Sequence, residues 1–254
     1  MLKIHDVTDL LESKFPLEAA YEWDNVGLQI GAKTKTIQRV MVALEATTPV
    51  IDEAIRQEVD LIITHHPFIF TGLKEINFAT PKGKNIEKLI KNDIALYSMH
   101  TNYDIADGGM NDVLADILKI HNCDPLLEDG LGRVGDLENP VNLEEFSCFV
   151  KGAFNLEKVS VIQGNKNLLK RVAVIGGAGG DYIHDAKAAG ADVFLTGDIK
   201  YHTAIDAQEI GLNLIDIGHY AEVIMEVKVM ELLQEKFGNQ LNVLVPTVTK
   251  NPIE

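Results

Sequence analysis

The side chains best suited to chemistry in this chain are histidines at the ends of short apolar runs. His65 and His66 follow "LIIT", His100 follows "IALYSM", and His219 follows "LIDIG". In open parallel sheets, ligands bind beyond the carboxyl ends of the strands. If these runs are strands, three of them deliver imidazoles to the functional edge of a sheet.

Two carboxylates accompany the histidines. Asp104 comes four residues after His100, and Glu222 comes three residues after His219, so a helix starting near residue 219 would place both members of the second pair on one face. Histidine with carboxylate and no cysteine suits Zn, Mn, Fe or Co. The competing interpretation is that each is an ordinary polar residue at a strand end. Their coincidence at three strand ends favours metal, and so many donors predict two ions that share a bridging carboxylate.

Adjacent residues on a regular strand point to opposite faces, so His65 and His66 can share a site only if the strand ends near Thr64. Pro67 favours this, because it donates no ladder hydrogen bond and biases His66 towards extended or turn geometry. We therefore expect both imidazoles to point towards Asp104 and the "HYAE" segment.

Other motifs carry weaker signals. In "GDIKYH", His202 either contacts substrate or the metal surroundings, with Asp198 and Lys200 at the same edge, or only caps a helix. The stretch "GGAGG" (176–180) lacks the dinucleotide spacing and a following GK[ST], which indicates a tight turn. Trp23, the only tryptophan, is expected to be a buried anchor beside a turn. No GxSxG occurs, and neither cysteine has a local partner that would mark a nucleophile.

Bulk composition excludes several classes of protein. The formal net charge of −15 disfavours nucleic-acid binding, because such a surface repels phosphate backbones. No apolar run approaches the ~20 residues of a membrane span, and the N-terminus has no signal-peptide pattern. We therefore expect a soluble cytoplasmic protein with a sizeable core, since 46% of the residues are hydrophobic.

Periodicity predicts alternating strands and helices. The first half carries expected strands at 39–46, 60–64 and 94–99 and expected helices at 6–15, 48–58, 84–92 and 110–120. The second half carries expected strands at 159–162, 171–175, 192–196, 212–217 and 241–246, with helices at 181–189, 203–210 and 221–237. This βαβ rhythm predicts parallel sheets with helices on their faces. The less regular segment 124–151 is the expected domain crossing.

Five stretches in order resemble the NIF-three-like family, whose bacterial members are labelled GTP cyclohydrolase I type 2 homologues. These are "WDNVGLQIG", "LIITHHPFIF", "HTNYD", "TGDIKYH" and "DIGHYAE", which span residues 23–222. The resemblance is to the short bacterial form. It implies two intertwined α/β domains with sheets flanked by helices, here 1–124 plus about 220–254 and about 125–219, with a metal site at their interface.

The resemblance also implies the ligands of two divalent ions, Zn, Fe or Mn. They fall on His65, His66, Asp104, His219 and Glu222, with Asp104 and Glu222 as the bridging carboxylates. His100 would lie beside the metals. Many relatives carry the last glutamate one residue later, where this chain has Val223, so Glu226 is a less favoured substitute. Relatives often have Asp at the position of Glu45, to which no role is assigned.

The family resemblance implies a toroidal homohexamer whose metal sites face an internal cavity. It favours a metal-dependent hydrolase in which hydroxide attacks C8 of guanine and formate leaves, with His100 or His202 moving protons. Two alternatives stay open. The same centre could cleave a phosphoester, or the protein could be a non-enzymatic metal-binding or adaptor protein.

Overall fold

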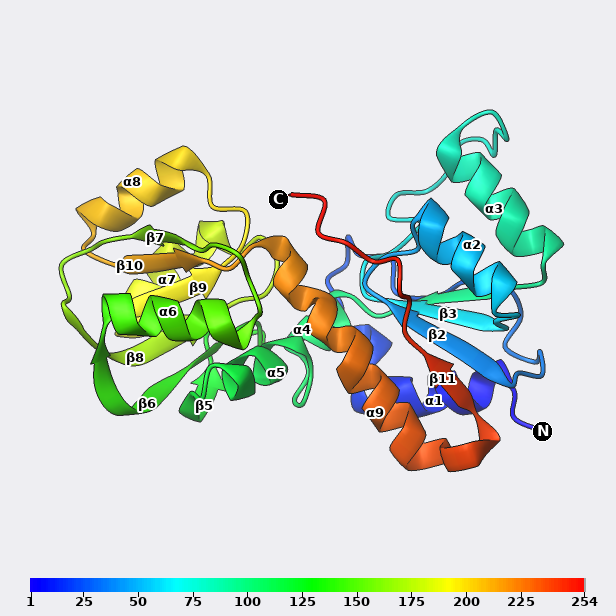
Figure 1. Ribbon diagram of the computed structural model, residues 1–254, viewed down its shortest axis with the longest axis horizontal. Coiled ribbons are helices and arrows are strands. Elements are labelled where there is room, and N and C mark those ends of the chain that lie inside the picture. Colours follow the sequence, from blue (N-terminus) through cyan, green and yellow to red (C-terminus); the bar gives the residue numbers. More distant parts are fainter. Residues whose placement is uncertain (254) are drawn as a thin grey trace. The chain divides into compact units, whose positions relative to one another are not determined.

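The computed structural model describes residues 1–253, and these form two α/β units, each with its own sheet (Figure 1). The first unit contains Met1–Tyr103 and the residues from Val223 onward, whereas the second is the continuous stretch Asp104–Glu222. The chain therefore returns at its end to the unit in which it began. The expected fold class, two intertwined α/β domains with helix-flanked sheets, is confirmed.

The sheet of the first unit has the strand order β1-β4-β3-β2-β11. Its members are β1 (Gly27–Ile30), β2 (Arg39–Ala43), β3 (Leu61–Thr64), β4 (Ala95–Ser98) and β11 (Asn242–Leu244). The last four run parallel, and β1 pairs antiparallel with β4. The expected parallel βαβαβ arrangement is confirmed, while β1 was missed because its residues continue directly from the "WDNV" segment.

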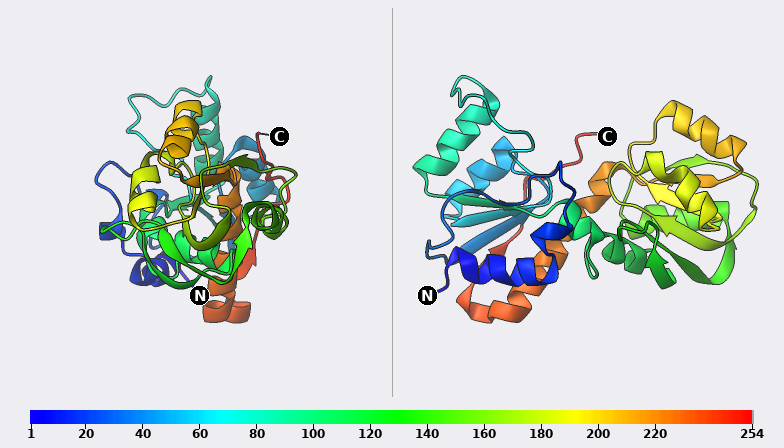
Figure 2. Two further views of the ribbon diagram at one scale, coloured as in Figure 1. Left: turned by 90° about the vertical axis from the view of Figure 1, so that its left-hand side faces the viewer. Right: turned by 180° about the vertical axis from the view of Figure 1, so that it is seen from behind.

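Four helices cover the first sheet, and Figures 1 and 2 show them on its two faces. Helices α2 (Thr48–Arg56) and α3 (Pro81–Lys91) lie on one face, and α1 (Ile4–Lys14) and α9 (Met225–Phe237) lie on the other. Every residue of β3 and β4 is buried. Buried β-branched and leucine side chains on both faces give these strands the continuous apolar runs typical of central parallel strands.

The second sheet has the order β5-β6-β8-β9-β10-β7. Its strands are β5 (His121–Pro125), β6 (Arg133–Asn142), β7 (Ser160–Ile162), β8 (Leu168–Val174), β9 (Val193–Thr196) and β10 (Asn213–Asp216). Strands β8, β9 and β10 run parallel, and the outer strands pair antiparallel. The flanking helices are α5 (Met110–Ile117), α6 (Leu143–Ala153), α7 (Ile183–Ala188) and α8 (Tyr201–Glu209).

The expected irregular crossing at 124–151 is instead mostly regular structure. It contains β6 and α6, and β5 and β6 form an antiparallel hairpin whose connecting Gly130 and Gly132 have positive φ. Pro140 lies in a register break of β6, which hid the strand pattern. The second unit also begins at Asp104, earlier than the expected 125, because α5 packs on β5, β6 and β8.

None of the described helices is long and apolar enough to cross a membrane. A short helix, α4 (Thr101–Ile105), carries the chain from the first unit into the second, and the 3₁₀ helix η3 (His219–Ile224) carries it back. Both contain predicted ligands: Asp104 lies on α4, and His219 and Glu222 lie on η3.

Candidate metal centre

Three imidazoles of the first unit converge beyond the ends of β3 and β4. The ring centroids of His65 and His66 are 4.9 Å apart, and that of His100 lies 5.2 Å from the first and 5.6 Å from the second. One nitrogen from each ring lies within 4.8 Å of the others. Strand β3 ends at Thr64, and the adjacent His65 and His66 rings are inclined at 46° rather than pointing to opposite faces. The expected strand end is confirmed.

Each of the four histidines at strand ends has its Nδ1 against an oxygen acceptor. The pairs are His65 with the Met99 carbonyl (2.9 Å), His66 with Glu45 (3.1 Å), His100 with Asp24 (3.0 Å) and His219 with Asp198 (2.8 Å). A neutral imidazole that donates from Nδ1 carries its lone pair on Nε2. This arrangement fixes the tautomer and ring orientation of metal-ligating histidines, so Nε2 is the nitrogen that each ring can offer to a metal ion or to a proton.

Asp24 is the most enclosed of the three carboxylate acceptors, since its side chain is 0% exposed, against 55% for Glu45 and 45% for Asp198. Burial alone would raise its pKa, but hydrogen bonds from the His100 ring and from Thr101 outweigh burial and lower the pKa from 3.8 to about 2. Thr101 donates both its backbone N–H (3.0 Å) and its hydroxyl (2.6 Å) to Oδ2. The carboxylate therefore stays ionised at neutral pH and accepts the hydrogen bond from His100 Nδ1.

In the second unit, η3 brings His219 and Glu222 together. Side chains three residues apart eclipse in a 3₁₀ helix, and here His219 Nε2 lies 3.3 Å from Glu222 Oε2. Two ligand atoms about 2.1 Å from one tetrahedral ion lie about 3.4 Å apart. The observed spacing therefore fits two ligands of a single ion, and the expected shared face is confirmed.

The stretch "GGAGG" (176–180) forms a turn that lies against Glu222. The sequence predicted a tight turn there but not its contact with Glu222. A Cβ added to Gly176 or Gly177 would lie 2.9 Å from Glu222 Oε1, and Gly177 has φ +62°. Buried Asn111 ties this turn to the Asp104 segment, because it accepts from the Gly176 N–H (2.9 Å) and donates to the Asp104 carbonyl (2.9 Å).

Other predicted residues take different places. Exposed His202 lies on α8 with its ring 5.5 Å from that of Tyr201, and its predicted catalytic role stays a prediction. Glu226 is buried on α9, where it accepts hydrogen bonds from the Leu44 N–H (2.9 Å) and from the Thr249 hydroxyl (3.5 Å). Burial raises the pKa of Glu226 to about 7 against those hydrogen bonds. Its contacts are those of a group that connects segments of the first unit.

Two expectations about side chains were incomplete or wrong. Trp23 is 58% exposed rather than a buried anchor, because its neighbour Asp24 is the group that the fold encloses. Glu45, which had no assigned role, orients His66. Little in the sequence indicated that Asp24, Glu45 and Asp198 orient histidines. Asp24 stands in a motif that resembles a turn, and of the three only Asp198 was expected at the same sheet edge as the histidines.

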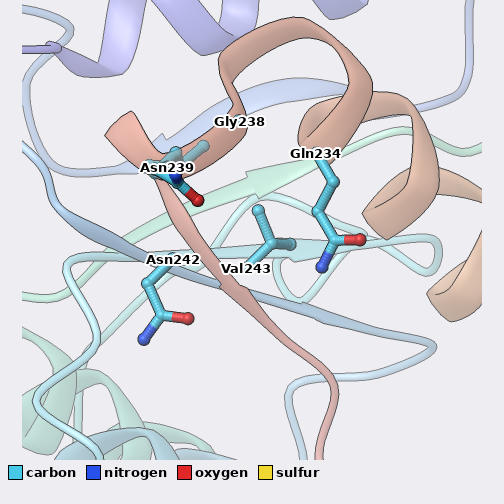
Figure 3. Close-up of a pocket in the computed structure, with 6 residues that line it drawn as sticks. Gln234, Gly238, Asn239, Asn242 and Val243 are labelled. Atoms are coloured by element: carbon cyan, nitrogen blue, oxygen red, sulfur yellow. The ribbon is translucent and has the colours of Figure 1, made fainter.

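A separate hollow lies at the C-terminal end of α9 (Figure 3). It is lined by Gln234, Gly238, Asn239, Leu241, Asn242 and Val243. This lining offers side-chain amides but no titratable group or histidine. The residues that line this hollow therefore supply neither an acid–base pair nor a strong metal ligand.

The fold and the donor groups define a two-unit α/β protein with imidazole and carboxylate ligands suited to divalent metals. The chain belongs to the Duf34/NIF3 (NGG1p interacting factor 3) family, which it matches over residues 2–252. It is 40% identical to a Streptococcus pneumoniae protein named GTP cyclohydrolase 1 type 2 homolog, with 97% of each chain covered. A Clostridium perfringens protein of the same name is 36% identical, with 100% of this chain and 99% of that one covered.

Solved structures show the same architecture. The crystal structure of a Bacillus cereus protein related to NIF3 superposes with a TM-score of 0.93 at 30% identity, covering 100% of this chain and 99% of that chain. The resemblance inferred from five short stretches is thus confirmed over the full length.

Proposed function

We propose that this protein is a metal-dependent hydrolase that binds two divalent cations. The residues that would hold them are His65, His66, Asp104, His219 and Glu222. The observation that carries this proposal is that Nδ1 of each histidine ligand faces an oxygen acceptor. Metal-binding histidines need this arrangement to present Nε2 to the ion, whereas histidines that serve only packing have no reason to share it. The absence of cysteine from the set favours Zn, Fe or Mn.

The donor chemistry is supported separately in each unit. His65 and His66 converge in the first, while the 3.3 Å approach of His219 to Glu222 suits one ion in the second. A bound divalent cation supplies Lewis-acid chemistry and makes water acidic enough to react near neutral pH. The protein's own groups then orient the substrate and move protons.

His100 is the proposed proton carrier. Its ring is held by ionised Asp24 and lies 5.2 Å from the His65 ring, centroid to centroid, so it is fixed beside the ligands. Histidine exchanges protons near neutral pH. Asp24 holds the proton on Nδ1, and Nε2 gives a proton to the leaving nitrogen or takes one from the attacking water.

The names of the relatives direct the choice of substrate to GTP. Hydrolysis at C8 would open the imidazole ring of guanine with one water, and a second water would release that carbon as formate. We also propose the assembly as a toroidal homohexamer with the metal sites facing its cavity. Light scattering tests the assembly: a mass of one or two chains would contradict it.

Activity and metal content test the proposal together. The purified protein is loaded with Zn, Mn or Fe and incubated with GTP and with a panel of phosphoesters, while formate and phosphate are measured. Elemental analysis should find up to two ions per chain, with fewer in His66→Ala and Asp104→Ala. The matched control is His184→Ala, which removes an exposed histidine of α7 away from the strand ends.

The outcomes separate the alternatives. Formate release that is lost in His66→Ala and kept in His184→Ala supports a cyclohydrolase, and phosphate release supports a phosphoesterase. Tight metal binding without turnover on either panel would contradict the hydrolase and leave a metal-binding or adaptor protein. Metal content that is unchanged in both ligand variants would refute the ligand assignment.

A further inference from the structure

We infer that Trp23 and Phe70 form a binding site for a planar heteroaromatic ring, of the kind a purine nucleotide carries, directly beside His100. We call Tyr21, Trp23, Phe70 and the His100 ring the aromatic site. This inference rests on the proposed function, because it assigns the part of the substrate that would be held next to the reacting groups. It adds binding residues outside the metal ligands.

The first observation is exposure. The Trp23 side chain is 58% exposed and Phe70 is 48% exposed, whereas Tyr97, Tyr103 and Phe194 in the cores are at most 1% exposed. Large aromatic side chains contribute most to stability when they are buried. Two that stay open to solvent beside a cluster of imidazoles therefore contribute surface for a ligand rather than packing.

The second observation is the geometry of the rings. Tyr21 stacks on the Trp23 indole at 5.5 Å with an angle of 26° between the planes. Phe70 lies 5.8 Å from Trp23 but is tilted by 50°, so it does not cover the indole by parallel stacking. Among the residues that the structure describes, Tyr21 is thus the only ring stacked nearly parallel to Trp23, and the opposite face of the indole has no parallel partner.

The third observation places this site against the chemistry. The His100 ring centroid lies 6.0 Å from that of Trp23 and 6.2 Å from that of Phe70, at 73° in both cases. A flat ring stacked on the indole would therefore lie near the imidazole that we propose as proton carrier. Offset stacking at such distances is the favoured arrangement of aromatic pairs.

The fourth observation is rigidity. Asp24, next to Trp23, is enclosed and bound by His100 and Thr101, which fixes the indole's backbone. The segment that carries Phe70 is tied to the same stretch, because Gln29 donates to the Ile69 carbonyl (3.3 Å) and accepts from the Ile69 N–H (2.8 Å). Rings held in advance lose little freedom on binding, which favours affinity.

Trp23 is the only tryptophan, so fluorescence excited at a wavelength that tyrosine does not absorb reports on this site. The metal-loaded protein is titrated with guanosine monophosphate and, separately, with ribose 5-phosphate, which has the sugar phosphate but no base. We expect saturable quenching by the nucleotide and none by the ribose phosphate. Phe70→Leu should weaken nucleotide binding by roughly tenfold, a typical effect of removing one aromatic contact to a base.

Phe78→Leu is the matched control. Phe78 is 54% exposed, follows Phe70 in the same loop region and contacts none of the aromatic site's rings, so its binding curve should match that of the unchanged protein. Equilibrium dialysis with Trp23→Leu tests the indole itself. Its nucleotide affinity should fall by roughly tenfold or more, and Trp23→Phe should recover part of the loss.

Several results would overturn the inference. Quenching by ribose 5-phosphate equal to that by the nucleotide would show that no ring is recognised. Emission that changes with protein concentration and not with nucleotide would show that a second copy of the chain covers Trp23. Turnover of a phosphoester without quenching by the nucleotide would refute the aromatic site and leave the hydrolase proposal intact. Quenching by the nucleotide without any turnover would support the aromatic site and contradict the hydrolase proposal.

Discussion

Replacing Asp24 by asparagine tests how far one enclosed carboxylate organises the histidine cluster. The substitution keeps the shape of the side chain and removes its charge. In the native protein the carboxylate accepts from the His100 ring at 3.0 Å and from two donors of Thr101 at 3.0 and 2.6 Å. An amide offers one acceptor oxygen, and its NH₂ group meets donors. We therefore expect Asp24→Asn to lose stability in the first unit.

The magnitude follows from the pKa. A fall from 3.8 in the unfolded chain to about 2 in the folded protein corresponds to about 2.5 kcal/mol of stability at neutral pH. Because the folded pKa is the lower one, this stability is present above about pH 4 and is lost as the pH falls through about 2. The difference between the two proteins should therefore shrink over that acidic window.

The assay is urea unfolding of the metal-free protein, followed by circular dichroism at neutral pH and at several acidic pH values. Asp9→Asn is the control, since Asp9 lies on α1 in the same unit with its side chain 67% exposed. Its effect should stay within about 0.5 kcal/mol. A loss for Asp24→Asn no larger than that of the control, or a loss that grows as the pH falls below 4, would refute the reasoning.

Three further substitutions follow from the same structure. Burial raises the pKa of Glu226 from 4.5 to about 7, so the ionised carboxylate destabilises the fold as the pH rises through that range. Glu226→Gln should therefore raise the free energy of unfolding in urea by about 3 kcal/mol at about pH 8 and change it little at about pH 4. Asp198→Asn should weaken metal binding about 10- to 100-fold in competition with a chelator, because it removes the acceptor from His219 Nδ1. Gly177→Ala should lower metal content without replacing a ligand, because its Cβ would lie 2.9 Å from Glu222 Oε1 in a backbone of φ +62°.

These three have distinct controls and refutations. A Glu226→Gln protein that keeps the native pH dependence would show that another group titrates there. Metal affinity that is unchanged in Asp198→Asn would mean that its hydrogen bond does not orient the ring. Gly72→Ala is the control for the glycine change, since nothing lies within 4 Å of a Cβ at that position. Equal metal content in both glycine variants would rule out the contact with Glu222.

The sequence predicted the elements that repeat a simple period. Strands β2, β3 and β4 are short apolar runs separated by amphipathic helices, and their parallel pairing follows from that rhythm. The hairpin of β5 and β6 was missed because it is half exposed, carries Pro140 in a register break and pairs antiparallel. Its stability comes from neighbouring strands rather than from local pattern.

The candidate site shows the same division. Imidazoles at strand ends were visible because their placement needs only local sequence. Their oxygen partners were not, because Asp24 reaches His100 across 76 positions and Asp198 reaches His219 across 21. Side-chain hydrogen bonds over such separations depend on the tertiary fold, so local sequence patterns cannot predict them.

The return of the chain's end to the first sheet affects how the protein is made. Strand β11 pairs with β2 in parallel, and Thr247 donates its N–H and hydroxyl to buried Glu53. The first unit therefore stays incomplete until Thr247 has left the ribosome, whereas the continuous second unit is synthesised without interruption. The second unit can thus complete its sheet before the first does, while β2 still lacks its β11 neighbour at one edge.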